Sequence, residues 1–222
     1  AMAAKELNPK IEIIGVEAQL YPSMYQAIHG LPPTSGGVSI AEGIAVKAPG
    51  VITKEIISRY VDDIILVDEL SLESAVQTMV ETGKLVVEGA GAAPLAAIRQ
   101  QQNRFEGRRI GLIACGANID SRLLSSILLR GMIRLGRMAR LRVEISDQPG
   151  VLSRVTEKIG DVGGNIVKIY HQRMFYDVPV KRAEADIVME TRDAAHIEEI
   201  IDRLTAAGFR TRRLDDTARE MY

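Results

Sequence analysis

Residues 146–155 read SDQPGVLSRV, and residues 163–173 read GGNIVKIYHQR. In the first stretch a Pro-Gly pair precedes an apolar run with helical spacing, and Asp147 can cap that helix. In the second, two glycines form a turn that leads into a strand. One strand (139–146) precedes these stretches, and a strand, an amphipathic helix and a short strand follow them. This β-α-β-β-α-β order predicts a ferredoxin-like split unit.

The start of the helix after Asp147 is a candidate ligand site. Its first N–H groups have no acceptor within the helix, and the helix dipole is positive at this end, so a carboxylate can bind there. Gly150 lets a backbone or ligand approach closely. The same residues could instead serve only as cap and turn. RNA-binding modules of this topology need aromatic side chains on the central strands, and these strands offer only Tyr170, so we expect no nucleic-acid binding.

Before residue 137, strand-like and helix-like segments alternate, which predicts an α/β unit with parallel strands. The expected strands are 11–18, 63–69 and 108–116, and the expected helices are 22–30, 53–61, 71–83, 89–101 and 120–136. Glycine and arginine then follow without periodicity, so we place a domain boundary there, giving domains 1–136 and 137–222. The arginines between 130 and 142 are expected to form a solvated linker. The chain opens in mid-helix without a cap, which predicts truncation upstream.

Composition bounds the class of protein. The 222 residues are 46% hydrophobic and 26% charged, with a net charge of −1, which excludes a disordered or collagen-like chain. No run approaches the ~20 apolar residues of a membrane span, so no membrane association is expected. The near-neutral charge argues against an electrostatic nucleic-acid binder. The one cysteine, Cys115, excludes an internal disulfide and fits a reducing cytoplasm.

Two stretches of the first domain can carry chemistry. VVEGAGAAPLAA (86–97) opens a helix with small residues, which lets that helix pack against a flat ligand or another backbone. LIACGAN (112–118) ends the strand expected at 108–116, which we expect to be buried. Ligands of open α/β sheets lie beyond the carboxyl ends of strands, where Cys115 would fall. Cys115 could equally be a small buried hydrophobic residue.

The C-terminal stretches resemble the ACT domain, a small amino-acid-binding module, over residues 139–216. The segment YDVPVKRAEADIVMETRDAAHIEEII (176–201) resembles in particular the ACT domain of short threonine dehydratases. The resemblance implies that an amino-acid effector binds between paired modules and that the protein is a homodimer or homotetramer. The implied effector-binding residues are Asp147, Gly150, Val151 and Leu152 of one copy, with Asn165 and Ile166 on the facing strand of this module or its partner.

The first domain resembles the fold type II pyridoxal-phosphate enzymes. GVEA (15–18), SIAEGIAV (39–46), VEGAGAAPLAA and CGAN occur in the order found in the threonine and serine dehydratases. The whole chain thus resembles the C-terminal part of a threonine ammonia-lyase, a carbon–nitrogen lyase. This implies part of a fold type II domain, a mostly parallel sheet with helices on both faces, followed by the ACT domain. The implied substrate is threonine, giving 2-oxobutanoate and ammonia, with serine as an alternative substrate.

The resemblance assigns roles to single residues. Cys115 corresponds to a Ser, Thr or Cys that meets the pyridine nitrogen of the cofactor, where a neutral partner leaves that nitrogen unprotonated and favours β-elimination. Glu88 corresponds to a glutamate near the ring, and Gly43 to a glycine whose backbone lies beside the cofactor. Gly116 completes the implied cofactor-binding set.

Glu17 corresponds to a ligand of a structural cation in some relatives. Its implied partners are the carbonyl of Tyr21 and the position of Ser23. A serine weakens such a site, because hard cations prefer charged oxygen ligands. The alternative is that Glu17 is a surface acid at the end of a strand.

The resemblance also leaves gaps. The Schiff-base lysine motif and the glycine-rich phosphate loop of the family do not occur, and none of the lysines before residue 137 is a convincing substitute. We therefore expect this chain by itself to be inactive. The alternative function is a stand-alone amino-acid sensor with a degenerate first domain. The sequence leaves open which amino acid regulates, with which sign, and whether the role is catabolic or, as in isoleucine biosynthesis, biosynthetic.

Overall fold

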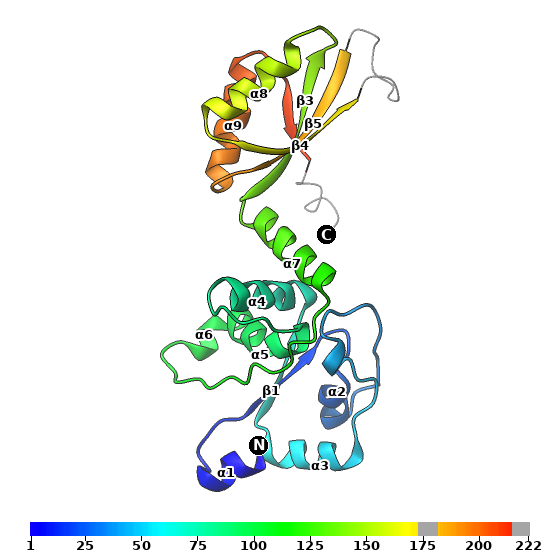
Figure 1. Ribbon diagram of the computed structural model, residues 1–222. Coiled ribbons are helices and arrows are strands. Elements are labelled where there is room, and N and C mark those ends of the chain that lie inside the picture. The colour runs from blue at the N-terminus through cyan, green and yellow to red at the C-terminus, as the bar shows by residue number, and fades with distance from the viewer. Residues whose placement is uncertain (173–181, 215–222) are drawn as a thin grey trace. The chain divides into compact units, whose positions relative to one another are not determined.

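The computed structural model describes residues 1–172 and 182–214. The chain divides into two compact units, Ala1–Ile127 (unit 1) and Leu128–Tyr222 (unit 2) (Figure 1). Helix α7 (Ser121–Arg134) contains this division, and the predicted domain boundary after residue 136 follows the end of the same helix. Residues 176–181 of the dehydratase-like motif and residues 215–222 lie outside the described part. Among the described residues, no helix has the length and apolar character of a membrane span.

Unit 1 is built on two parallel strands. Strand β1 (Ile14–Ala18) pairs with β2 (Asp63–Val67), and Ala18 lies opposite Val67 at their carboxyl ends. This pairing confirms the parallel arrangement predicted from the alternation of elements. The described helical segments of the unit, besides the start of α7, are α1 (Met2–Leu7), α2 (Ser23–His29), the 3-10 turn η1 (Glu42–Ile44), α3 (Val51–Tyr60), α4 (Glu69–Glu81), α5 (Gly89–Gln100) and α6 (Gln102–Phe105).

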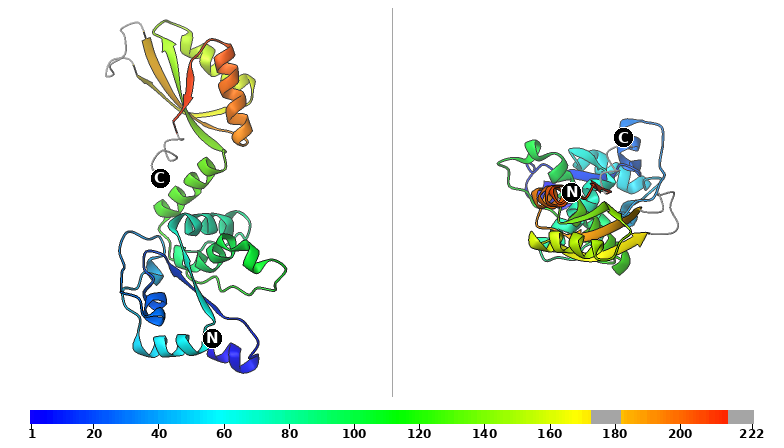
Figure 2. Two further views of the ribbon diagram at one scale, coloured as in Figure 1. Left: turned by 180° about the vertical axis from the view of Figure 1, so that it is seen from behind. Right: turned by 90° about the horizontal axis from the view of Figure 1, so that it is seen from above.

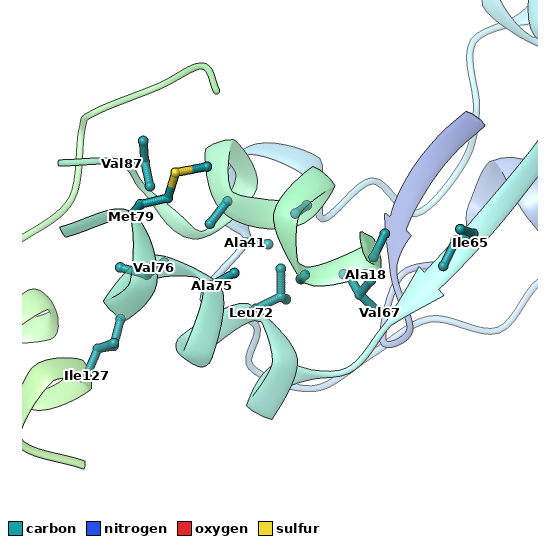
Figure 3. Close-up of a cluster of buried hydrophobic side chains, with 14 residues drawn as sticks. Ala18, Ala41, Ile65, Val67, Leu72, Ala75, Val76, Met79, Val87 and Ile127 are labelled. Carbon is teal, nitrogen blue, oxygen red and sulfur yellow. The ribbon is translucent and has the colours of Figure 1, made fainter. Parts of the chain in front are cut away.

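Helices cover both sides of these strands. In both views α4 and α5 lie on one side of β1 and β2, and α2 and α3 lie on the other (Figures 1 and 2). Leu72, Val76 and Met79 of α4 form the core with the strands and with the alanines of α5 (Figure 3). Because alanine side chains are short, α5 can pack closely against its neighbours, and this closeness shapes the candidate site below.

The expected buried strand at 108–116 is wrong. Residues 107–120 form no helix or strand, and the side chains of Ile110 and Ile113 are 43% and 78% exposed. A strand requires a neighbour that completes its ladder of hydrogen bonds, and no described strand pairs with this segment. The apolar composition of this segment therefore suits a strand, but no described strand lies beside it to complete the hydrogen-bond ladder.

Unit 2 has the predicted β-α-β-β-α-β order. Its strands are β3 (Met138–Ser146), β4 (Asn165–Gln172), β5 (Arg182–Glu190) and β6 (Thr211–Arg213), arranged β4-β5-β3-β6 in one antiparallel sheet. Helices α8 (Val151–Asp161) and α9 (Ala194–Ala206) cover one face of that sheet (Figures 1 and 2). Their apolar faces bury Val155, Ile159 and Ile200 against inward-facing residues of β3 and β5. The ferredoxin-like prediction is confirmed.

The start of α8 differs from the prediction. Its N-cap is Gly150, in the left-handed conformation with φ +82°, and no side chain caps the helix. Asp147 stands three residues before this N-cap, because residues 146–151 form a turn in which Gln148 N–H donates to the Ser146 carbonyl. The prediction that Asp147 caps the helix is therefore wrong, since an N-cap side chain must reach the first free N–H groups.

Candidate functional site

The candidate site of unit 1 is centred on Glu88 at the start of α5. Glu88 is the N-cap residue of that helix, and its side chain makes no capping hydrogen bond. Its backbone N–H donates to the Gly116 carbonyl over 3.0 Å, and its own carbonyl accepts from Ala92 N–H over 3.1 Å. The helix start and the segment around Gly116, distant in sequence, are thus held together, and the Glu88 carboxylate remains available for other contacts.

Two of the predicted cofactor residues surround the Glu88 carboxylate. Gly116 has φ +79°, and a Cβ added there would lie 2.6 Å from Cδ of Glu88. A Cβ on Gly43 would lie 3.2 Å from Oε1 of Glu88 and 3.2 Å from Cβ of Ala90. A side chain at Gly116 would strain the backbone and displace the Glu88 carboxylate, and one at Gly43 would require a small shift of Ala90 or Glu88. The structure therefore brings Glu88, Gly43 and Gly116 together, with Cys115 next to Gly116 in the chain.

Two further glycines of the site lie in α5 itself. A Cβ on Gly91 would collide with the Cys115 carbonyl oxygen, and one on Gly89 would lie 2.9 Å from Ala41 N. Neither residue is assigned to the cofactor site in the sequence analysis. The signal was present in the run of small residues at 89–93, which predicts that another backbone approaches the helix. That backbone belongs to residues 40–41 and 115–116.

Glu69 anchors the segment that carries Gly43. Its Oε2 accepts from Ile40 N–H over 2.9 Å, and Ile40 in turn lies against Gly89. Its Oε1 is buried without a hydrogen-bond partner. Glu69 follows the end of β2 by two residues, so this side of the site lies where the parallel strands end, as expected for α/β sheets.

Cys115 is exposed in the described structure. It does not line either of two surface hollows, of about 740 and 390 Å³, which lie at α2–α3 and at residues 99–104. The alternative interpretation of Cys115 as a buried hydrophobic residue is therefore wrong. Its backbone carbonyl lies against Gly91 of α5, and the residue directly precedes Gly116 of the Glu88 cluster.

These residues suit the ring of pyridoxal phosphate. The glycines let residues 40–43, 88–91 and 115–116 pack closely together, and this brings a thiol and a carboxylate, both able to hydrogen-bond to ring substituents, into one region of the chain. The set contains no cationic side chain that would bind the phosphate, so it fits the ring rather than the whole cofactor.

Glu17 has a clear structural role. Its Oε1 accepts from Met24 N–H over 2.9 Å and its Oε2 from Tyr25 N–H over 2.8 Å, so the carboxylate satisfies free amides at the start of α2. A cation at Glu17 would share its oxygens with these two amides. No group of three or more metal-binding side chains occurs in residues 1–172 and 182–214. Cation binding by Glu17 stays a prediction.

The predicted effector residues of unit 2 fall into two groups. Asp147 lies in the turn before α8, and the start of α8 carries Gly150, the buried Val151 and the half-buried Leu152. Asn165 and Ile166 begin β4, just after the other end of that helix. The 11 residues of α8 separate its ends by about 16 Å. One copy of unit 2 therefore does not bring the two groups together.

The sheet face opposite the helices carries a buried carboxylate. Asp186 of β5 has no exposed side-chain surface, and its oxygens accept from Arg142 Nε over 2.6 Å and from Arg140 Nη2 over 2.6 Å. Hydrogen bonds from Arg142 and then Arg140 lower the pKa of Asp186, and burial opposes this effect. The Tyr170 ring lies 5.8 Å from the Arg140 guanidinium and 4.6 Å from Lys168 Nζ.

The chain thus joins an α/β unit, in which glycines surround the Glu88 carboxylate, to a ferredoxin-like unit. Residues 1–116 match the family model "Pyridoxal-phosphate dependent enzyme", and residues 139–209 match the ACT domain. The chain belongs to the family of pyridoxal-phosphate dependent enzymes, and its second unit carries an ACT domain.

Similar proteins point to one group within this family. The chain is 32% identical over 214 residues to the L-threonine ammonia-lyase of Thermotoga maritima, covering 96% of the chain and 53% of that protein. It is 37% identical over 214 residues to the L-threonine ammonia-lyase of Geobacter sulfurreducens, covering 94% of the chain and 52% of that protein. The chain thus spans about half the length of these relatives. The resemblance drawn from the sequence is confirmed.

A solved structure is similar to part of the chain. The processed form of threonine deaminase isoform 2 from Solanum lycopersicum superposes with a TM-score of 0.51 at 26% identity. The superposition covers 55% of this chain and 37% of that one. The fold predicted for the first domain agrees with this likeness.

Proposed function

We propose that the chain is the C-terminal part of a pyridoxal-phosphate dependent L-threonine ammonia-lyase, which converts threonine to 2-oxobutanoate and ammonia and also accepts serine. The observation that carries the proposal is the convergence of Glu88, Gly43 and Gly116 beside Cys115 at the start of α5. The likeness to two enzymes of that name along almost the whole chain supports it.

Each residue of the site would have a different role toward the cofactor. When bound, pyridoxal phosphate supplies an electron sink for the substrate's α-carbon. Cys115 would present a neutral thiol to the pyridine nitrogen, and Glu88 would stand near the ring. Gly43 and Gly116 would let both segments lie close to the Glu88 carboxylate, and Glu69 would hold the 40–43 segment in place through its bond to Ile40 N–H.

Unit 2 would bind a regulatory amino acid between two copies. The start of α8 offers free N–H groups for a carboxylate, and Asn165 offers a side-chain amide. The two groups lie at opposite ends of α8, so a site that uses both requires a second copy of the chain. Strand β4 is an edge strand and exposes Val167, which suits pairing with β4 of that copy in a homodimer or homotetramer. The single cysteine supports a cytoplasmic location.

The release of 2-oxobutanoate tests the catalytic proposal. The protein that contains this sequence is incubated with pyridoxal phosphate and L-threonine, and the keto acid is measured. We expect keto acid from threonine, less from serine, and none from alanine, which has no β-hydroxyl to lose. A protein that binds amino acids but releases no keto acid from threonine would instead support the stand-alone sensor.

Calorimetry tests the effector proposal separately. Isoleucine, valine, serine and threonine are titrated into the chain, with Gly150→Val as the variant and Gly160→Ala as its control. Gly150 has φ +82°, which a valine adopts only under strain, whereas Gly160 lies in a helix with open space beside it. We expect heat from at least one amino acid, lost in Gly150→Val and kept in Gly160→Ala. A folded wild-type chain that gives no heat with any of the four contradicts the effector site.

A further inference from the structure

The corner between β5 and α9 connects an effector residue with the end of α7. Asn165 Nδ2 donates to Oε2 of Glu190 over 2.8 Å. The next residue, Thr191, donates from Oγ1 to the Gly136 carbonyl over 2.6 Å and from its N–H to the Arg137 carbonyl over 3.0 Å. The two hydrogen bonds from Thr191 to the Gly136 and Arg137 carbonyls form a clasp between the corner and the end of α7. Glu190 thus contacts the predicted effector residue Asn165, and the next residue, Thr191, contacts the end of α7.

The end of α7 is held tightly at the clasp. Gly136 is buried with φ +67°, and a Cβ there would lie 2.5 Å from Ala194 N and 2.7 Å from Ala194 Cα. The Arg137 N–H closes the helix by donating to the Met132 carbonyl over 2.8 Å. The helix end is therefore packed closely against the start of α9.

The corner is also fixed to the far end of α8. His196 is 1% exposed, its Nδ1 accepts from Arg192 N–H over 3.1 Å, and its Nε2 lies 2.9 Å from the Val162 carbonyl. Since Nδ1 accepts, the ring proton is on Nε2 and is donated to that carbonyl. Residues 190–196 are thus hydrogen-bonded to the start of β4, to the end of α7 and to the end of α8.

We propose that Glu190 and Thr191 transmit occupation of the effector site to the end of α7; this inference rests on the proposed function. Between two copies, an amino-acid carboxylate that accepts from the start of α8 of one copy and from Asn165 of the other, with its ammonium directed away from Glu190, places a second negative charge beside Glu190. Like charges on neighbouring strands repel, so Glu190 moves away and the clasp loosens. Helix α7 carries this change along its own length, and the same helix contains Ile127, which is buried in the core of unit 1.

The substitution Asn165→Asp tests the coupling without any ligand. It places a carboxylate where the amide was and imitates the bound effector's charge. Both Asn165 and Glu190 are exposed, so folding is not at risk. The readout is hydrogen exchange at the amides of Thr191 and Arg137 in the full chain. We expect exchange about three-fold faster at both amides, with the amides of Val155 and Ile159 in α8 unchanged.

Two control variants separate charge from loss of the hydrogen bond. Asn165→Ala removes the bond without adding charge and is expected to leave both amides close to wild type. Glu190→Gln added to Asn165→Asp removes the repulsion and is expected to restore slow exchange. Wild-type exchange in Asn165→Asp, or equal acceleration in Asn165→Ala, overturns the proposal.

Adding an amino-acid ligand to the wild-type chain distinguishes failure of this inference from failure of the proposed function. The amino acid that gives calorimetric heat is added to the wild-type chain, and it should accelerate exchange at the same two amides. Heat without acceleration overturns the coupling and leaves the effector site intact. Absence of heat from isoleucine, valine, serine and threonine contradicts the effector site, and Asn165→Asp still decides the coupling.

Discussion

At Gly116 the backbone conformation and a neighbouring side chain both disfavour a larger residue. The φ of +79° strains any other residue, and an added Cβ would lie 2.6 Å from Cδ of Glu88. We predict that Gly116→Ala lowers the free energy of unfolding by about 1–3 kcal/mol, measured by urea denaturation. Gly111→Ala is the matched control, since no atom lies within 4 Å of its added Cβ. Equal stability of the two variants would show that the Glu88 cluster is not closely packed.

Asp186 predicts a pH-dependent contribution to stability. Because Arg142 and Arg140 lower its pKa in the folded state, its contribution is complete above the unfolded pKa of about 3.9 and is lost as the pH falls through the folded value. We predict that Asp186→Asn costs about 1–3 kcal/mol at pH 7 and at pH 5, and less at pH 3. Urea denaturation at these three pH values measures this. A cost that stays constant down to pH 3 would contradict the assignment.

Single residues were predictable from the sequence where a local rule applied. Gly30 closes α2 with φ +64°, as glycine after a helix predicts. The positions of Glu88, Gly43 and Gly116 came from the family resemblance, because no local rule shows that residues 43, 88 and 116 meet. The Asp147 cap failed because a turn separates that residue from the helix.

At the level of elements, two helical glycines have opposite roles. Gly91 of α5 faces the Cys115 carbonyl, whereas Gly160 of α8 faces open space. We predict that Gly91→Ala destabilises by about 1–3 kcal/mol through overpacking. Gly160→Ala should stabilise by up to about 1 kcal/mol, because alanine favours the helix. Thermal unfolding of the two variants measures both signs, and the same sign for both would contradict the close approach of α5 to residues 115–116.

Elements of unit 2 were predictable because their strands alternate inward and outward residues and their helices have one apolar face, although β3 pairs with β5 and β6 far along the chain. The strand expected at 108–116 was not, because a ladder depends on neighbours that a segment's own residues do not specify. The apolar side chains at 110–113 are typical of a buried strand, yet they are exposed. An apolar run therefore does not by itself show that a strand forms; a neighbouring strand must also be present.

At the level of the whole molecule, the effector site predicts pairing of two chains through β4. Val167 is 53% exposed on that edge strand. We predict that Val167→Lys weakens self-association about ten-fold, because a charge on an edge strand opposes strand pairing. Sedimentation over a range of concentrations measures this. Ala206→Lys at the end of α9 adds the same charge away from the edge and should leave association unchanged; equal weakening by both would contradict pairing through β4.

The most direct test of the account is the identity of the group at position 115. The protein that contains this sequence is prepared with Cys115→Ser and with Cys115→Asp, and the rate of 2-oxobutanoate formation from threonine is measured with pyridoxal phosphate present. A neutral serine should keep the rate within about three-fold, whereas an aspartate, which holds the ring nitrogen protonated, should lower it at least about ten-fold. Equal rates for the two variants would contradict the placement of Cys115 at the cofactor.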